Sequence, residues 1–145
     1  TETDWEVYPQ GLTDTLCWVR DRYGNIPQYV TENGAAFYDP PVAGPDGVHD
    51  PLRVDYLRSH LEAVAEAIRR GVDVRGYMAW SLLDNLEWAH GFSKRFGITH
   101  VDFATGHRTP KDSARWYAEF ITQHRASQGA QRGCGSSATP RGTSG

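Results

Sequence analysis

The stretch PQYVTENG, residues 27–34, and the later stretch VDVRGYMAWS, residues 72–81, decide the fold of this chain. The first is rich in β-formers and closes on an Asn-Gly turn pair, so a strand is predicted over residues 27–32. The second is predicted to be a strand as well. Gly76 within it indicates a bulge or a close approach of two backbones.

A helix is predicted between these two strands. Asp50 is a suitable N-cap, Pro51 a suitable first helical residue, and Gly71 a suitable stop. The apolar residues in between recur at helical spacing: Leu57, Leu61, Val64, Ala65 and Ile68. Further helices are predicted over residues 9–24 and from Thr109 onward, and a short hairpin is predicted to turn near Thr105-Gly106.

Strand, helix and strand in this order form a βαβ unit, whose strands run parallel. The carboxyl ends of parallel strands meet at one edge, so Glu32 and Trp80 are predicted to lie there together. In α/β barrels this edge carries the active site. A closed barrel needs about 250 residues, and the chain has 145. The sequence is therefore either part of a barrel or a small open α/β sheet.

Composition excludes several other classes of protein. The formal net charge is −3, which argues against a basic surface that binds nucleic acid. No apolar run approaches the roughly 20 residues of a membrane span. The two cysteines and six histidines show neither a CxxC nor an HExxH spacing, so we expect no metal site. A secretory signal is not evident, which weakly favours the cytoplasm.

Residues 126–145 are rich in Gly and Ser and are expected to be a disordered tail.

Two groups of residues could carry chemistry. Glu32 ends its strand and could act as a nucleophile, a base or a ligand, although most glutamates are solvated surface residues. The second group, WSLLDNLEW at residues 80–88, combines two indoles with two acids. An indole stacks on the apolar face of a sugar ring, while a carboxylate accepts hydrogen bonds from its hydroxyls. The alternative is that Trp80 and Trp88 are core residues and that Asp84 and Glu87 are solvated.

Four motifs in order give this chain a resemblance to glycoside hydrolase family 1. They are WEVYPQGL, TENG, YMAWSLLDNLEWAHGFSKRFGITHVD and RTPKDSARWY, and they extend over residues 1 to about 125. The resemblance implies that residues 1–125 form the C-terminal third of a (β/α)₈ TIM barrel. The two predicted strands would be the seventh and eighth of that barrel, with flanking helices.

The resemblance also implies a role for each candidate residue. Glu32 matches the nucleophile of a retaining β-glucosidase, which works by double displacement. Trp80, Glu87, Trp88 and Phe96 match residues that hold the sugar, with Glu87 gripping the 4- and 6-hydroxyls. A carboxylate there would repel a phosphate, so the implied substrate is a non-phosphorylated β-glucoside or short β-linked oligosaccharide. No cofactor is implied.

The family's acid/base residue lies in a TFNEP-like motif on the fourth strand, and this sequence has no such motif. We therefore expect the isolated chain to be inactive and to need the N-terminal part of the same barrel as its partner. One alternative is a non-catalytic remnant that binds sugar weakly. Another is β-galactosidase or β-fucosidase specificity. A third is an inverting pair of Glu32 with Asp84 or Glu87, whose carboxyl groups would lie about 6.5–9.5 Å apart.

Overall fold

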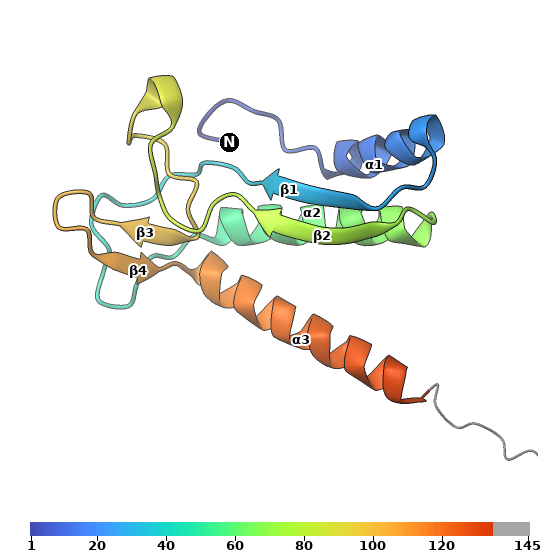
Figure 1. Ribbon diagram of the computed structural model, residues 1–145. Helices are drawn as coiled ribbons and strands as arrows, with labels where there is room; N and C mark the ends of the chain where they lie inside the picture. Colours follow the sequence, from blue (N-terminus) through green and yellow to red (C-terminus); the bar gives the residue numbers. More distant parts are fainter. Residues whose placement is uncertain (135–145) are drawn as a thin grey trace, which may run out of the picture.

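The computed structural model of the chain describes residues 1–134, and Figure 1 shows its elements in order. They are α1 (Pro9–Tyr23), β1 (Gln28–Asn33), α2 (Pro51–Arg69), β2 (Val74–Ala79), the short 3-10 helix η1 (Trp88–His90), β3 (Thr99–Val101), β4 (Arg108–Pro110) and α3 (Asp112–Cys134).

The predicted βαβ unit is confirmed. β1 and β2 pair in parallel and are joined by α2, so their carboxyl ends lie at the same edge (Figure 1). Gly76 of β2 pairs with Tyr29 of β1, and a Cβ on Gly76 would lie 2.7 Å from the Tyr29 ring. Only glycine leaves room for that ring, which is the close approach that the sequence indicated.

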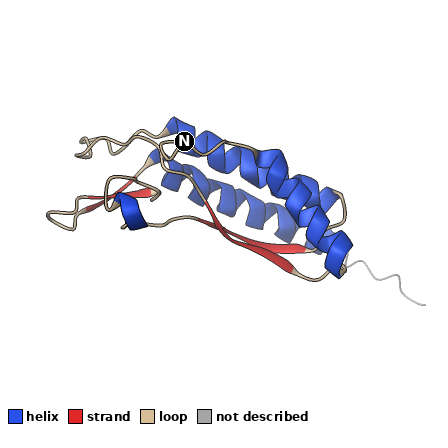
Figure 2. Ribbon diagram, turned by 90° about the horizontal axis from the view of Figure 1, so that it is seen from above, coloured by secondary structure: helices blue, strands red, loops and turns tan. Residues whose placement is uncertain are grey.

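The core lies between the sheet and the first two helices. Leu16 of α1 packs with Val64 and Ala67 of α2, and the partly buried Val30 and Tyr77 of the strands pack against this cluster. All three helices lie on one side of the two-stranded sheet (Figure 2). Because side chains alternate along a strand, Tyr29 and Met78 point to the other face. Both are about half exposed, at 54% and 47%.

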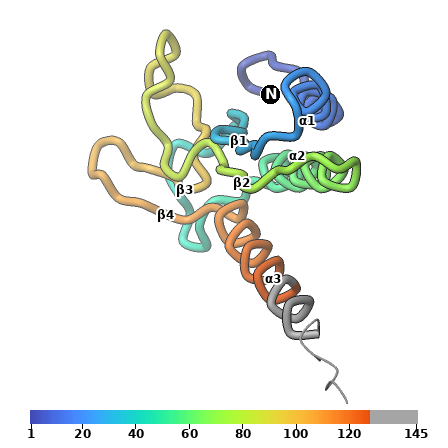
Figure 3. Tube along the Cα trace, turned by 45° about the vertical axis from the view of Figure 1, so that its right-hand side comes forward, coloured from blue at the N-terminus to red at the C-terminus, as the bar shows by residue number. Residues whose placement is uncertain are grey.

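The C-terminal region differs from the sequence prediction in two places. Thr109 and Pro110 pair with β3 in an antiparallel hairpin, so α3 begins only at Asp112. The helix then leads away from the sheet (Figure 3) and continues to Cys134, so the tail predicted over residues 126–145 is helical as far as that residue. Extending an existing helix avoids the cost of nucleation. The Ala and Gln residues of this stretch also have good helix propensity. Residues 135–145 lie outside the described part of the chain.

Six buried or partly buried charged residues tie the loops after both strands together. Lys111 donates to Asp39 at 2.6 Å and to Asp84 at 2.8 Å. Arg53 pairs with Asp39 and Asp50, and Arg95 pairs with Asp84. We call these residues the buried ion-pair network: Asp39, Asp50, Arg53, Asp84, Arg95 and Lys111. Because the alternating charges satisfy one another, the network can lie in the interior and hold both loops in place.

Candidate active site

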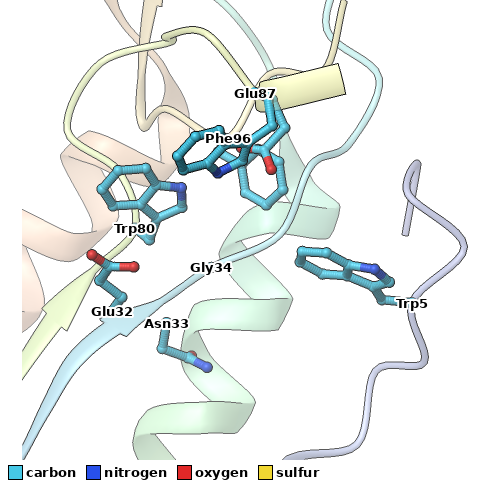
Figure 4. Close-up of a pocket in the computed structure, with 8 residues that line it drawn as sticks. Trp5, Glu32, Asn33, Gly34, Trp80, Glu87 and Phe96 are labelled. Atoms are coloured by element: carbon cyan, nitrogen blue, oxygen red, sulfur yellow. The ribbon is translucent and has the colours of Figure 1, made fainter. Parts of the chain in front are cut away.

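A pocket of about 250 Å³ opens at the carboxyl ends of β1 and β2 (Figure 4). All five residues that the sequence singled out line it: Glu32, Trp80, Glu87, Trp88 and Phe96. They come from β1, from the segment that follows β2, and from the loop before β3. Complete small-molecule sites usually enclose about 300–1,000 Å³. The pocket is therefore smaller than most complete sites.

Glu32 lies near the end of β1, and its carboxylate points toward the Trp80 indole in Figure 4. The side chain is exposed, and it forms no ion pair or hydrogen bond within residues 1–134. A carboxylate with free oxygens at a strand end is available to attack or to bind a ligand.

Aromatic rings provide most of the pocket wall. Phe96 is almost fully buried, and its ring centroid lies 5.9 Å from that of Trp5. Trp80 is partly exposed, whereas Trp88 is 87% exposed. The Trp80 and Trp88 indoles thus keep accessible faces and are not core residues. Exposed indole faces suit the C–H face of a pyranose.

Glu87 brings a second carboxylate to the pocket from the loop after β2. The residue is the N-cap of η1, where its amide donates to the Gly91 carbonyl at 2.7 Å and its carbonyl accepts from the His90 amide at 2.7 Å. Gly91 has a φ of 59°, a conformation that glycine adopts without strain. Glu87 and Trp88, which are adjacent in the sequence, both belong to this tight turn.

Backbone hydrogen bonds at Trp80 and Ser81 link the segment after β2 to β1 and to the loop before β3. The Trp80 amide donates to the Asn33 carbonyl at 2.9 Å, and the Ser81 amide donates to the Phe96 carbonyl at 3.2 Å. The Trp80–Ser81 peptide bond is cis. A Cβ on Gly34 would overlap the Trp80 carbonyl oxygen, so glycine is required where the chain leaves β1.

Three pocket residues were missed by the sequence analysis: Trp5, Asn33 and Gly34. Trp5 reaches the pocket because the N-terminal segment lies beside the chain that leaves β1, where the Glu2 amide donates to the Ala36 carbonyl at 2.9 Å. No local pattern encodes that long-range contact. The motif WEVYPQGL, which contains Trp5, was the one available signal.

Asp84 does not belong to the pocket, and its interpretation as a solvated loop acid is wrong. The side chain is fully buried, ion-paired to Arg95 and Lys111, and accepts a hydrogen bond from the Gly97 amide at 3.0 Å. These partners occupy both carboxylate oxygens. Asp84 is thus excluded as the free partner acid that an inverting pair with Glu32 would need.

Within residues 1–134, no three His, Cys, Asp or Glu side chains gather as a metal site. None of the helices in that range is both long and apolar enough to cross a membrane.

The pocket places indole faces and carboxylates at the carboxyl edge of parallel βα units, which is the edge that carries the active site in α/β barrels. A profile described as "Glycosyl hydrolase family 1" matches residues 1–126. The chain belongs to glycosyl hydrolase family 1.

Its relatives are glycosidases of several specificities. The chain is 54% identical over 129 residues to a bifunctional β-D-glucosidase/β-D-fucosidase of Bifidobacterium breve, covering 87% of this chain and 28% of that protein. It is 46% identical to a 6-phospho-β-galactosidase of Staphylococcus aureus, covering 83% of this chain and 26% of that protein. The chain thus spans little more than a quarter of the length of these relatives.

Solved structures give the same result. The family 1 β-glucosidase of Thermotoga maritima in complex with isofagomine lactam superposes with a TM-score of 0.80 at 48% identity. The match covers 84% of this chain and 28% of that one. The fold is therefore the C-terminal portion of a (β/α)₈ barrel, as predicted, and the described residues do not close the barrel.

Proposed function

We propose that this chain is the C-terminal part of a retaining β-glycosidase of the β-glucosidase type, with Glu32 as its nucleophile. The observation that carries the proposal is the free Glu32 carboxylate beside the Trp80 indole at the barrel's carboxyl edge. The family assignment supports the same chemistry.

The proposed reaction is a double displacement. A Glu32 oxygen attacks the anomeric carbon, and the bond to the aglycone oxygen breaks as that oxygen takes a proton from a second carboxyl group. The covalent glycosyl-enzyme is then cleaved by water, which gives its proton back to the second group. We place this second group on an earlier barrel strand that is not among these 145 residues. The N-terminal part of the barrel is thus the proposed partner.

Trp80, Trp88 and Phe96 are proposed to form the apolar surface on which the sugar lies. Glu87 is proposed to accept hydrogen bonds from two adjacent hydroxyls of that sugar. Its negative charge would repel a phosphate at the same position, because like charges interact strongly in a partly buried site. We therefore propose a non-phosphorylated substrate, although a 6-phospho-β-galactosidase is among the relatives.

Specificity for more than one sugar is a second candidate. The Bifidobacterium breve relative is described as acting as both a glucosidase and a fucosidase. The Thermotoga maritima β-glucosidase is described in complex with galacto-hydroximolactam. Both observations favour a sugar site of this family that tolerates changes at the 4- and 6-positions.

The test uses a chimera in which residues 1–126 replace the matching segment of the Thermotoga maritima β-glucosidase. We expect the chimera to hydrolyse an aryl β-glucoside and Glu32→Gln to abolish turnover, because the amide is not a nucleophile. The exposed Glu62→Gln is the matched control and should retain full activity. We expect the isolated chain to be inactive. Turnover by the isolated chain that Glu32→Gln abolishes would place the acid/base within it.

A further inference from the structure

The backbone that carries Glu32 is a bulge in the β1–β2 ladder. Val30 pairs with Tyr77, and Asn33 pairs with Ala79, so Thr31 and Glu32 together lie opposite Met78 alone. A bulge leaves the extra residue without regular ladder pairing, and it often re-aims a side chain beside an active site. Regular ladder hydrogen bonds therefore do not fix the position of Glu32.

The side chain of Asn33 provides a separate attachment directly after the bulge. The Tyr77 hydroxyl donates to Asn33 Oδ1 at 2.7 Å, and Asn33 Nδ2 donates to the Tyr56 hydroxyl at 3.4 Å. Figure 4 shows the Asn33 side chain pointing away from the Glu32 carboxylate. The two consecutive side chains thus serve opposite sides of the strand, with Glu32 toward the aromatic wall and Asn33 toward the two tyrosines.

Both tyrosines are well placed to act as fixed anchors. Tyr77 belongs to β2, whereas Tyr56 belongs to α2 and stacks on His60 with ring centroids 3.9 Å apart. Burial raises the pKa of Tyr77 and the pKa of Tyr56, so both hydroxyls remain protonated at neutral pH. A tyrosine hydroxyl can donate or accept, so Tyr77 serves as the donor to Asn33 Oδ1 and Tyr56 as the acceptor from Asn33 Nδ2.

We propose that Tyr77 and Tyr56 are positioning residues that act through Asn33 to hold the bulge and so aim the Glu32 carboxylate. We call the three side chains the Asn33 clamp. The inference rests on the proposed role of Glu32, because the clamp acts through the strand end that carries this residue. A nucleophile misplaced by about 1 Å costs on the order of 100-fold in rate, so a small shift of the bulge is enough to matter.

Tyr77→Phe in the chimera tests the clamp, because it deletes one hydroxyl and keeps the ring. Tyr117→Phe is the matched control. Tyr117 is also partly buried, and its hydroxyl donates to the Tyr77 carbonyl at 3.2 Å without touching Asn33. The readouts are kcat and KM for an aryl β-glucoside. The amplitude of the initial burst of leaving group gives the concentration of active sites, and kcat is normalised to that concentration. That normalisation removes any loss caused by misfolded enzyme.

We expect Tyr77→Phe to lower kcat about tenfold with KM changed less than about threefold, since aim affects the transition state and not binding. Tyr117→Phe should keep the parental kcat. A Tyr77→Phe kcat within about twofold of the control would overturn the proposal.

A second variant covers the case in which Tyr77→Phe does not fold. Tyr56→Phe removes the longer contact from α2 and should lower kcat severalfold, and a parental kcat in that variant would then overturn the clamp. Failure of the proposed function gives a different result. In that case the Glu32→Gln chimera would still turn over substrate, whatever the tyrosine variants do.

Discussion

At the scale of single residues, Glu87 is the second carboxylate of the pocket, and we propose that it binds the sugar and takes no part in bond cleavage. It lines the pocket from the loop opposite Glu32, and no side chain within residues 1–134 neutralises it. A carboxylate that accepts hydrogen bonds from sugar hydroxyls contributes about 1.5–3 kcal/mol per charged bond. Its loss should therefore affect substrate affinity in the chimera.

We predict that Glu87→Gln lowers kcat/KM for an aryl β-glucoside by about 10- to 100-fold. Steady-state kinetics of the chimera, with Glu62→Gln as control, provide the measurement. The same variant should narrow the preference for the plain glucoside over its 6-phosphate, because the repelling charge is gone. If the parental chimera hydrolysed the 6-phosphate faster than the plain glucoside, this would contradict the proposed role of Glu87.

Parallel topology was enough to predict that Glu32 and Trp80 lie together, because both stand at the carboxyl ends of neighbouring strands. Glu87, Trp88 and Phe96 were assigned to the same site only by the resemblance to glycoside hydrolase family 1. The contacts of Asn33 were not predictable in this way. Tyr77 lies 44 positions from Asn33 and Tyr56 lies 23 positions away, so their meeting depends on register and helix packing.

At the scale of elements, α1, β1, α2 and β2 followed from periodicity and turn residues, whereas the start of α3 and the buried ion-pair network did not. From the sequence alone, Asp84 looks like a solvated acid in a loop. Its partner Lys111 lies 27 positions away, and Lys111 reaches Asp39 across 72 positions. Only the packed loops reveal that this acid is structural.

We predict that Asp84→Asn destabilises the chimera by about 3–5 kcal/mol, the usual cost of removing one partner from a buried ion pair. Lys111 would lose one carboxylate partner and keep only Asp39. The midpoint of guanidinium denaturation measures the effect. Asp55→Asn is the matched control, because its pair with Arg58 is exposed and should contribute little. Equal midpoints for both variants would show that the network is not a stabilising element.

At the scale of the whole molecule, β1 and β2 form a two-stranded sheet with one helix-covered face. Within residues 1–134 each of these strands pairs only with the other, which leaves an unpaired edge on either side. Tyr29 and Met78 are exposed on the uncovered face. Such edges and apolar faces are features that a closed barrel would bury.

We propose above all that Glu32 becomes the covalent nucleophile once the barrel is complete. The most direct measurement is to treat the chimera with an activated 2-deoxy-2-fluoro-β-glucoside, which slows release of the glycosyl-enzyme, and to map the modified peptide by mass spectrometry. We expect one added fluoroglucosyl group on Glu32 and no added group on the Glu32→Gln chimera. A label on Glu87, or an active chimera that is never labelled at Glu32, would contradict it.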